Sequence, residues 1–188
     1  LFMYGHLYDR IYISSDTHPF DHISFAIRWI DREGNHPPPY TLITFEEYVK
    51  GVWRATNPVD QEWQGEYLRQ LKRPHYIWPN HGEKESWEWK FADPLRWLLS
   101  PGNKNNAGVC LYDRCVFIEK GMHRDVEQFG IFGADVPYPG APETTINIPL
   151  ITEINSFDQT DWAGEASSHC VMDSVNQFLA HIPRRHWT

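Results

Sequence analysis

The positions of apolar residues divide the chain into strand-like and helix-like segments. Residues 7–14 (LYDRIYIS) are rich in β-branched and aromatic side chains and end in a polar cluster, which predicts a strand. A short apolar run at 73–79 predicts a second strand, and another at 109–118 predicts a strand or a hairpin. In residues 145–154 the apolar residues Ile146, Ile148, Leu150 and Ile154 share one face of an extended segment, which predicts a further strand.

Helical spacing predicts a second set of segments. The clearest begins with a capping box formed by Thr44 and Glu47 and continues through repeated apolar positions to residue 55. Another begins with Asn57 as N-cap followed by Pro58 in the first turn. Apolar spacing favours three further helices, at residues 22–32, 93–99 and 168–182, although alternation fits 22–32 as well.

The mixture of strands and helices predicts the fold class. We expect an α/β or α+β fold, built as a mixed-sheet sandwich flanked by helices. A chain of 188 residues fits a single domain spanning 1–188, with an insertion considered at 33–52.

The tetrapeptide LYDR occurs twice, beginning at Leu7 and at Leu111, each time before an apolar run. Four residues are too few to indicate a duplication. The repeat indicates two strands of similar build.

Composition narrows the function classes. The 17 Lys and Arg residues against 25 Asp and Glu residues give a formal charge of -8, which argues against general nucleic-acid binding. No apolar run is long enough to cross a membrane, and the first residues lack the pattern of a signal peptide. Three cysteines do not suit a disulfide scaffold. We therefore expect a cytoplasmic protein with no membrane partner.

The strongest chemical signal is Asp16-Thr17-His18, directly after the first predicted strand. In an extended segment residues i and i+2 point to the same side. The Asp16 carboxylate and a neutral His18 imidazole can therefore reach one metal ion.

These residues resemble a known family. IYISSDTH looks like the first motif of the calcineurin-like metallophosphoesterases, in which a strand ends in Asp-x-His. Residues 79–83 (PNHGE) approximate the third motif of that family, whereas the second motif is broken at 56–60 (TNPVD). There Asn57 stands where the bridging aspartate belongs, and by local pattern 57–60 is an ordinary helix start.

The resemblance implies a divergent metal-dependent phosphoesterase that cleaves a phosphorylated substrate of unknown class through a metal-bound water. It implies that His81 protonates the leaving group while Asp60 orients His81. It implies a divalent metal of unknown identity, Mn, Fe, Zn or Mg. The implied metal ligands are Asp16, His18, Asn57, Asn80, His123 and His181.

Two other hypotheses stay open. The chain could be a non-catalytic, acidic, Trp-rich binding protein, an inhibitor or immunity-type molecule with a protein partner. Cys170 beside His169 near a helix start also has the position of a nucleophile, but the sequence identifies no histidine to activate it.

Overall fold

The computed structural model describes Leu1 and residues 3–182. Six short strands are present in this part of the chain: β1 (Ile11–Asp16), β2 (Trp29–Ile30), β3 (Leu42–Ile43), β4 (Arg54–Ala55), β5 (His75–Tyr76) and β6 (Cys115–Lys120). The α-helices are α1 (Phe45–Val49), α2 (Gln61–Gln70), α3 (Asp93–Leu98), α4 (Ile148–Ile154) and α5 (Met172–His181).

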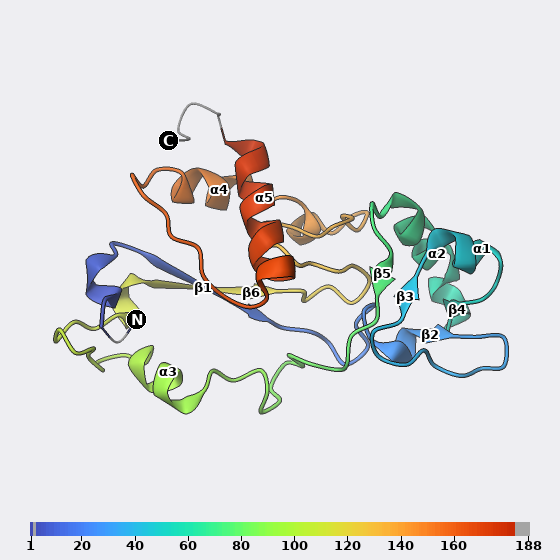
Figure 1. The fold of residues 1–188 in the computed structure, drawn as a ribbon, viewed down its shortest axis with the longest axis horizontal. Helices are drawn as coiled ribbons and strands as arrows, with labels where there is room; N and C mark the ends of the chain where they lie inside the picture. Colours follow the sequence, from blue (N-terminus) through green and yellow to red (C-terminus); the bar gives the residue numbers. More distant parts are fainter. Residues whose placement is uncertain (2, 183–188) are drawn as a thin grey trace.

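The two longest strands, β1 and β6, run parallel through the middle of the molecule (Figure 1). Ile11 pairs with Cys115 and Asp16 pairs with Lys120, so the two strands end at the same level. The LYDR repeat stands at the same offset, because Leu7 and Leu111 each precede the first strand residue by four positions. The prediction of two strands of similar build is confirmed.

The antiparallel pairs β2–β4 and β3–β5 lie together with α1 and α2 at one end of the molecule (Figure 1). They enclose an apolar core in which Trp29, Ile43, Tyr67 and Ile77 are fully buried. A capping box formed by Thr44 and Glu47 starts α1, as the sequence predicts. This end is therefore a packed body with its own core.

A second apolar cluster holds α4 and α5 together. Phe132, Ile151, Ile154 and Phe178 form it, and all four are buried. In Figure 1 these two helices lie on one side of the β1–β6 pair and α3 lies on the other.

The fold prediction is confirmed: the structure is a mixed α/β arrangement with small sheets flanked by helices. The predicted helices after Asn57, at 93–99 and at 168–182 are present. The helix after Thr44 is present but ends at Val49 instead of continuing to residue 55, because Arg54–Ala55 form β4. The segment 33–52 contains β3 and α1, and its status as an insertion stays a prediction. Among the described residues, no helix is long and apolar enough to span a membrane.

Two further secondary-structure predictions are wrong. Residues 148–154 form α4 rather than a strand, because Asn147 accepts a hydrogen bond from Leu150 N and a proline follows in the first turn. Ile151 and Ile154, three residues apart, then face the core. Residues 22–32 contain a short 3₁₀ turn and β2 instead of a long helix. Ile23 and Phe25 are both fully buried, which matches the alternating interpretation.

Candidate active site

The parallel register of the two long strands creates the centre of the site. Asp16 ends β1 and Lys120 ends β6, directly opposite each other. The Lys120 ammonium donates hydrogen bonds to Asp16 Oδ1 and to the carbonyl oxygen of Gln128, the latter at 3.2 Å. Because only 5% of the Lys120 residue is exposed, this charge is held in one place.

Cys170 lies on the other side of the same ammonium. Lys120 Nζ is 3.5 Å from Cys170 Sγ. Cys170 belongs to the π-helical turn Ser167–Val171, which leads directly into α5. Burial raises the pKa of the Cys170 thiol, while the positive charge of Lys120 acts in the opposite direction. The Lys120 ammonium therefore contacts the Cys170 thiol on one side and the Asp16 carboxylate on the other.

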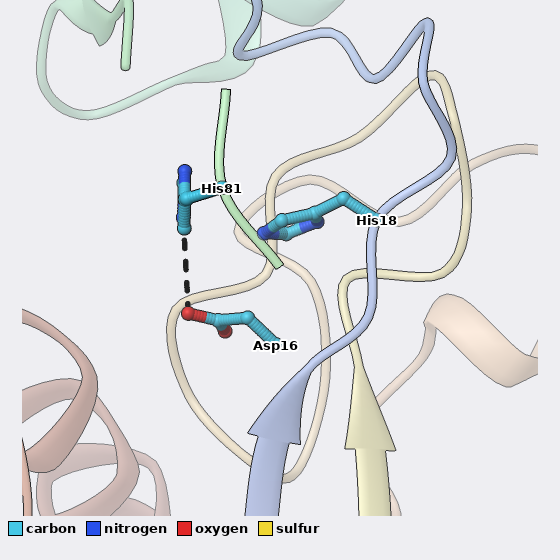
Figure 2. A group of neighbouring side chains, drawn as sticks. All are labelled: Asp16, His18 and His81. Carbon is cyan, nitrogen blue, oxygen red and sulfur yellow. Dashed lines mark ion pairs between the residues drawn. The ribbon is translucent and has the colours of Figure 1, made fainter. Parts of the chain in front are cut away.

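A second group of side chains meets at Asp16. One potential ligand atom from each of Asp16, His18 and His81 lies within 4.8 Å of the other two. Figure 2 shows the two imidazoles and the carboxylate facing one another above the ends of the strands. His81 Nε2 is 3.8 Å from Asp16 Oδ2, the oxygen that Lys120 does not hold.

Hydrogen bonds orient both imidazoles for metal binding. His18 Nδ1 is 2.9 Å from the Gly121 carbonyl oxygen, and His81 Nδ1 is 2.8 Å from the Pro79 carbonyl oxygen. A carbonyl only accepts, so each Nδ1 carries a proton and Nε2 is the nitrogen of each ring that is left to face a metal. Such outer hydrogen bonds are typical of histidine ligands.

The protonation states also suit a metal. Burial lowers the pKa of His18, so its ring is neutral near pH 7. Burial raises the pKa of Asp16, but the charge and hydrogen bond of Lys120 together with the two nearby imidazoles lower it, and the pKa lies below its ordinary value. A neutral imidazole and an ionised carboxylate are the forms that bind a divalent metal. Asp16, His18 and His81 therefore fit a metal.

Two glycines allow the chain to approach this group. Gly82 has a φ of 59°, and a Cβ there would lie 2.9 Å from Asp16 Cβ. Gly121 has a φ of 72°, and a Cβ there would lie 2.3 Å from His18 Cε1. Both positions exclude a larger residue by conformation and by space.

A cavity of about 380 Å³ opens beside these groups. Aromatic rings form much of its wall, and Asp16, His18, His81, Lys120 and Cys170 all reach it. Tyr40 on its rim adopts a positive φ of 70°, a strained conformation for a non-glycine residue. Strained residues often mark functional sites.

The other residues that the sequence singled out lie elsewhere. Asp60 forms ion pairs with Arg28 and Arg124, at 3.3 and 3.2 Å. The ring of His123 packs against that of Tyr138, with the ring centroids 4.5 Å apart. Among the described residues, neither Asp60 nor His123 joins the metal-binding group.

The remaining three predicted ligands have local partners. Asn57 is an exposed N-cap whose side chain accepts from Val59 N. The exposed Asn80 donates to Glu83 Oε1 at 2.8 Å. His181 is exposed on the last turn of α5, with Nδ1 2.8 Å from the Gln177 carbonyl oxygen.

Comparison with known proteins identifies the fold. Structures of the yeast nicotinamidase Pnc1p match with 21% identity and a TM-score of 0.55 over 90% of this chain, and the complex with nicotinaldehyde matches with 18% identity and the same TM-score and coverage. The chain shares its fold with these nicotinamidase structures. An Acinetobacter baumanii nicotinamidase (pyrazinamidase) matches with 19% identity and a TM-score of 0.51 over 92% of the chain.

The chain spans about three fifths of those solved structures, 61%, 62% and 61% of their lengths. No protein-family model matches the sequence, and no curated protein matches it.

These comparisons correct the sequence-based identification. The resemblance to calcineurin-like metallophosphoesterases is wrong, because the structural neighbours are nicotinamidases. The predicted phosphatase function and phosphorylated substrate are also wrong, because the names of those structural neighbours refer to enzymes that act on amides. The alternative of a non-catalytic binding protein is not supported by them either.

The sequence interpretation missed Lys120 entirely and left Cys170 without a partner. It sought a histidine to activate the thiol, whereas the structure supplies a lysine from a distant strand. The available signal was the LYDR repeat, which aligns Asp16 with Lys120 when the two strands are set in parallel.

Proposed function

We propose that this chain carries a cysteine-dependent amidohydrolase site for a small carboxamide. The observation that carries the proposal is the position of Lys120, whose ammonium contacts both Asp16 Oδ1 and Cys170 Sγ at the wall of one cavity. The nicotinamidase fold supports amide hydrolysis as the reaction class.

Cys170 is the nucleophile in this proposal. The Lys120 ammonium, 3.5 Å from Sγ, stabilises the thiolate, and the start of α5 adds the positive end of a helix dipole. The thiolate attacks the amide carbonyl carbon to form a thioester as the carbon–nitrogen bond breaks. Lys120 holds a proton close to the departing nitrogen, and water then releases the carboxylic acid.

Asp16 keeps Lys120 charged and in place. The carboxylate raises the pKa of Lys120 against the lowering effect of burial, so the side chain stays an ammonium. Asp16 therefore acts through Lys120 while its second oxygen remains directed at His81.

Asp16, His18 and His81 would hold a divalent metal, with Zn, Fe, Mn and Mg as candidates. Two imidazole nitrogens and one carboxylate oxygen suit Zn, Fe or Mn better than Mg, which prefers oxygen ligands. When bound, the metal supplies Lewis acidity to the cavity.

The cavity limits the substrate to a small molecule. A volume of about 380 Å³ lies at the lower end of the range for ligand pockets. Its aromatic walls favour a flat, ring-bearing carboxamide over a peptide.

The direct test is release of ammonia from pyridine-3-carboxamide and pyrazine carboxamide by purified, metal-loaded protein. Cys170→Ser should abolish release, and intact-mass measurement of the wild type should trap an acyl adduct on Cys170. The matched control is Cys115→Ser, which alters a thiol on β6 outside the cavity. Ammonia release that survives Cys170→Ser would refute the proposal.

A further inference from the structure

Glu127 is a buried carboxylate that the proposed reaction does not use. Its residue is only 5% exposed, yet it lines the cavity. Gln128 N donates to Glu127 Oε1 at 2.9 Å. No Lys or Arg nitrogen within the described part of the chain lies within the 4.0 Å of an ion pair to this carboxylate. A buried charge normally has an opposite charge as partner, so Glu127 indicates that a partner enters from the cavity.

The nearby cations are already engaged. Arg73 pairs with Asp135 at 2.8 Å and with Asp173 at 2.6 Å. Lys120 pairs with Asp16. The cavity wall carries three carboxylates, from Asp16, Glu127 and Glu165, against the single ammonium of Lys120. Asp16 is matched by Lys120 and belongs to the metal-binding group, so Glu127 is the buried carboxylate of the wall that, among the described residues, has no ion-pair partner and can attract a positively charged ligand.

Aromatic rings stand around the same space. The ring centroid of Trp78 lies 6.2 Å from that of Tyr40, 6.4 Å from that of Phe129 and 5.4 Å from that of His169. Trp78 makes interplanar angles of 86°, 77° and 81° with these rings, so the rings form corners rather than one stack. Perpendicular rings can present a face to a cation, as cages for quaternary ammonium groups do. The ring of Phe129 already has one such contact, since Arg73 Cζ lies 4.6 Å from its centroid.

We infer that the substrate carries a positive charge: the cavity selects a small carboxamide bearing a cationic ring or ammonium group, with Glu127 as the specificity-determining residue. The inference rests on the proposed function for the identity of the reacting carboxamide. Glu127 attracts the charge, the rings of Tyr40, Trp78 and Phe129 surround it, and the amide lies toward Cys170.

A bound metal would be held by the carboxylate of Asp16 and not by that of Glu127. The group that fits the metal consists of Asp16, His18 and His81 and does not include Glu127. Glu127 belongs to the loop after β6, whereas Asp16 ends β1. The experiment nevertheless measures metal content in every variant, because loss of metal would be a separate effect of Glu127.

The test compares two ligands of nearly equal shape, neutral pyridine-3-carboxamide and cationic 1-methylpyridinium-3-carboxamide. Binding is measured by titration calorimetry with zinc-loaded Cys170→Ser protein, which binds without turnover. The cation should bind at least tenfold more tightly, about 1.4 kcal/mol. Glu127→Gln in the same background should reduce the preference to threefold or less. Glu62→Gln removes an equal charge from an exposed position on α2 and should leave the preference unchanged.

Equal or tighter binding of the neutral ligand would overturn the inference, as would a preference that survives Glu127→Gln. Loss of zinc in Glu127→Gln with an unchanged preference would assign Glu127 to the metal instead, and would overturn it too. If Glu127→Gln does not fold, Trp78→Leu serves as the second variant and should lower the preference by removing a ring face.

Ammonia release by the wild type separates this inference from the proposed function. A strong cation preference without ammonia release from either ligand would retain the inference about binding and reject the amidohydrolase. Ammonia release from both ligands at equal efficiency would do the reverse.

Discussion

Two clusters of charged side chains lie within this molecule, and they differ in what their polar atoms face. In the arginine cluster (Arg28, Asp60, Asp125, Arg124 and Asp21) each side chain forms an ion pair within the cluster. The cavity cluster consists of Asp16, His18, His81, Lys120 and Cys170. Several of its polar atoms face the cavity: Nε2 of each imidazole, one oxygen of Asp16 and the thiol of Cys170.

The arginine cluster therefore stabilises the fold, whereas the cavity cluster can contact a ligand. The arginine cluster ties the loop that follows β6 to the α2 end of the molecule, because Arg28 contacts Asp125 on one side and Asp60 on the other. Trp63 of α2 adds a hydrogen bond to the Asp125 carbonyl oxygen at 2.7 Å. That loop continues to Gln128, which holds Lys120. The charges that are paired within the protein hold this loop in place. The polar groups that face the cavity can contact a ligand.

The largest expected effect is loss of the nucleophile. Cys170→Ala should lower kcat/KM for carboxamide hydrolysis at least about 10³-fold, because the thioester cannot form. The unfolding free energy should change little, since the thiol is only half-buried. Steady-state ammonia release and urea unfolding measure the two quantities. Activity within tenfold of the wild type would remove Cys170 from the mechanism.

Breaking the arginine cluster should affect stability instead. Arg28→Met leaves Asp60 and Asp125 with less compensation at side chains only 13% exposed, and should cost about 3–5 kcal/mol of unfolding free energy. Arg69→Met, which removes an exposed pair with Glu66, should cost less than about 1 kcal/mol. Urea unfolding of both variants makes the comparison. Equal losses would show that burial of the Arg28 pairs has no energetic weight.

Two neighbouring histidines, His18 in the cavity wall and the fully buried His22, extend this contrast to a single pair of side chains. The rings of His18 and His22 lie with centroids 4.2 Å apart. His18 has one nitrogen free, whereas His22 uses Nδ1 toward Ser24 Oγ and Nε2 toward the Val126 carbonyl oxygen. His18→Ala should therefore reduce metal affinity at least about tenfold through loss of a ligand.

His22→Gln is the matched control. It should lower the unfolding free energy, because the fully buried ring loses its hydrogen bonds, but should retain the metal. Metal content after dialysis, determined by elemental analysis, distinguishes the two variants. Loss of metal in both would mean that the free nitrogen of His18 is not what binds it.

The sequence predicted the local parts of this structure better than the long-range ones. The helix after Thr44 follows from a capping box within four residues, and Asp16-Thr17-His18 does lie at a strand end with both side chains in the metal-binding group. The Lys120–Cys170 contact joins residues 50 positions apart, and no local pattern encodes it. Asp60 and His123 had plausible spacing but belong to other contacts. The motif Asp16-Thr17-His18 thus led to residues of the metal-binding group but to the wrong protein family.

The smallest expected effect concerns His75, a buried histidine at the α2 end of the molecule, where polar groups form hydrogen bonds within the protein. His75 is 2% exposed, and its Nε2 lies 3.0 Å from the Ile23 carbonyl oxygen. Burial lowers its pKa below 6.5 in the folded state. Near and below pH 6.5 His75 therefore binds more protons in the unfolded state than in the folded state, and its contribution to stability falls as pH falls.

The slope from this one group should reach at most about 1.4 kcal/mol per pH unit between its folded and unfolded pKa values. Urea unfolding at pH 7.5, 6.5 and 5.5 measures it. His75→Gln removes the titrating group, so the loss of stability between pH 6.5 and 5.5 should become smaller than in the wild type. If the two proteins lose the same amount, His75 is protonated as readily in the folded state as in the unfolded one, and its carbonyl partner compensates fully for burial.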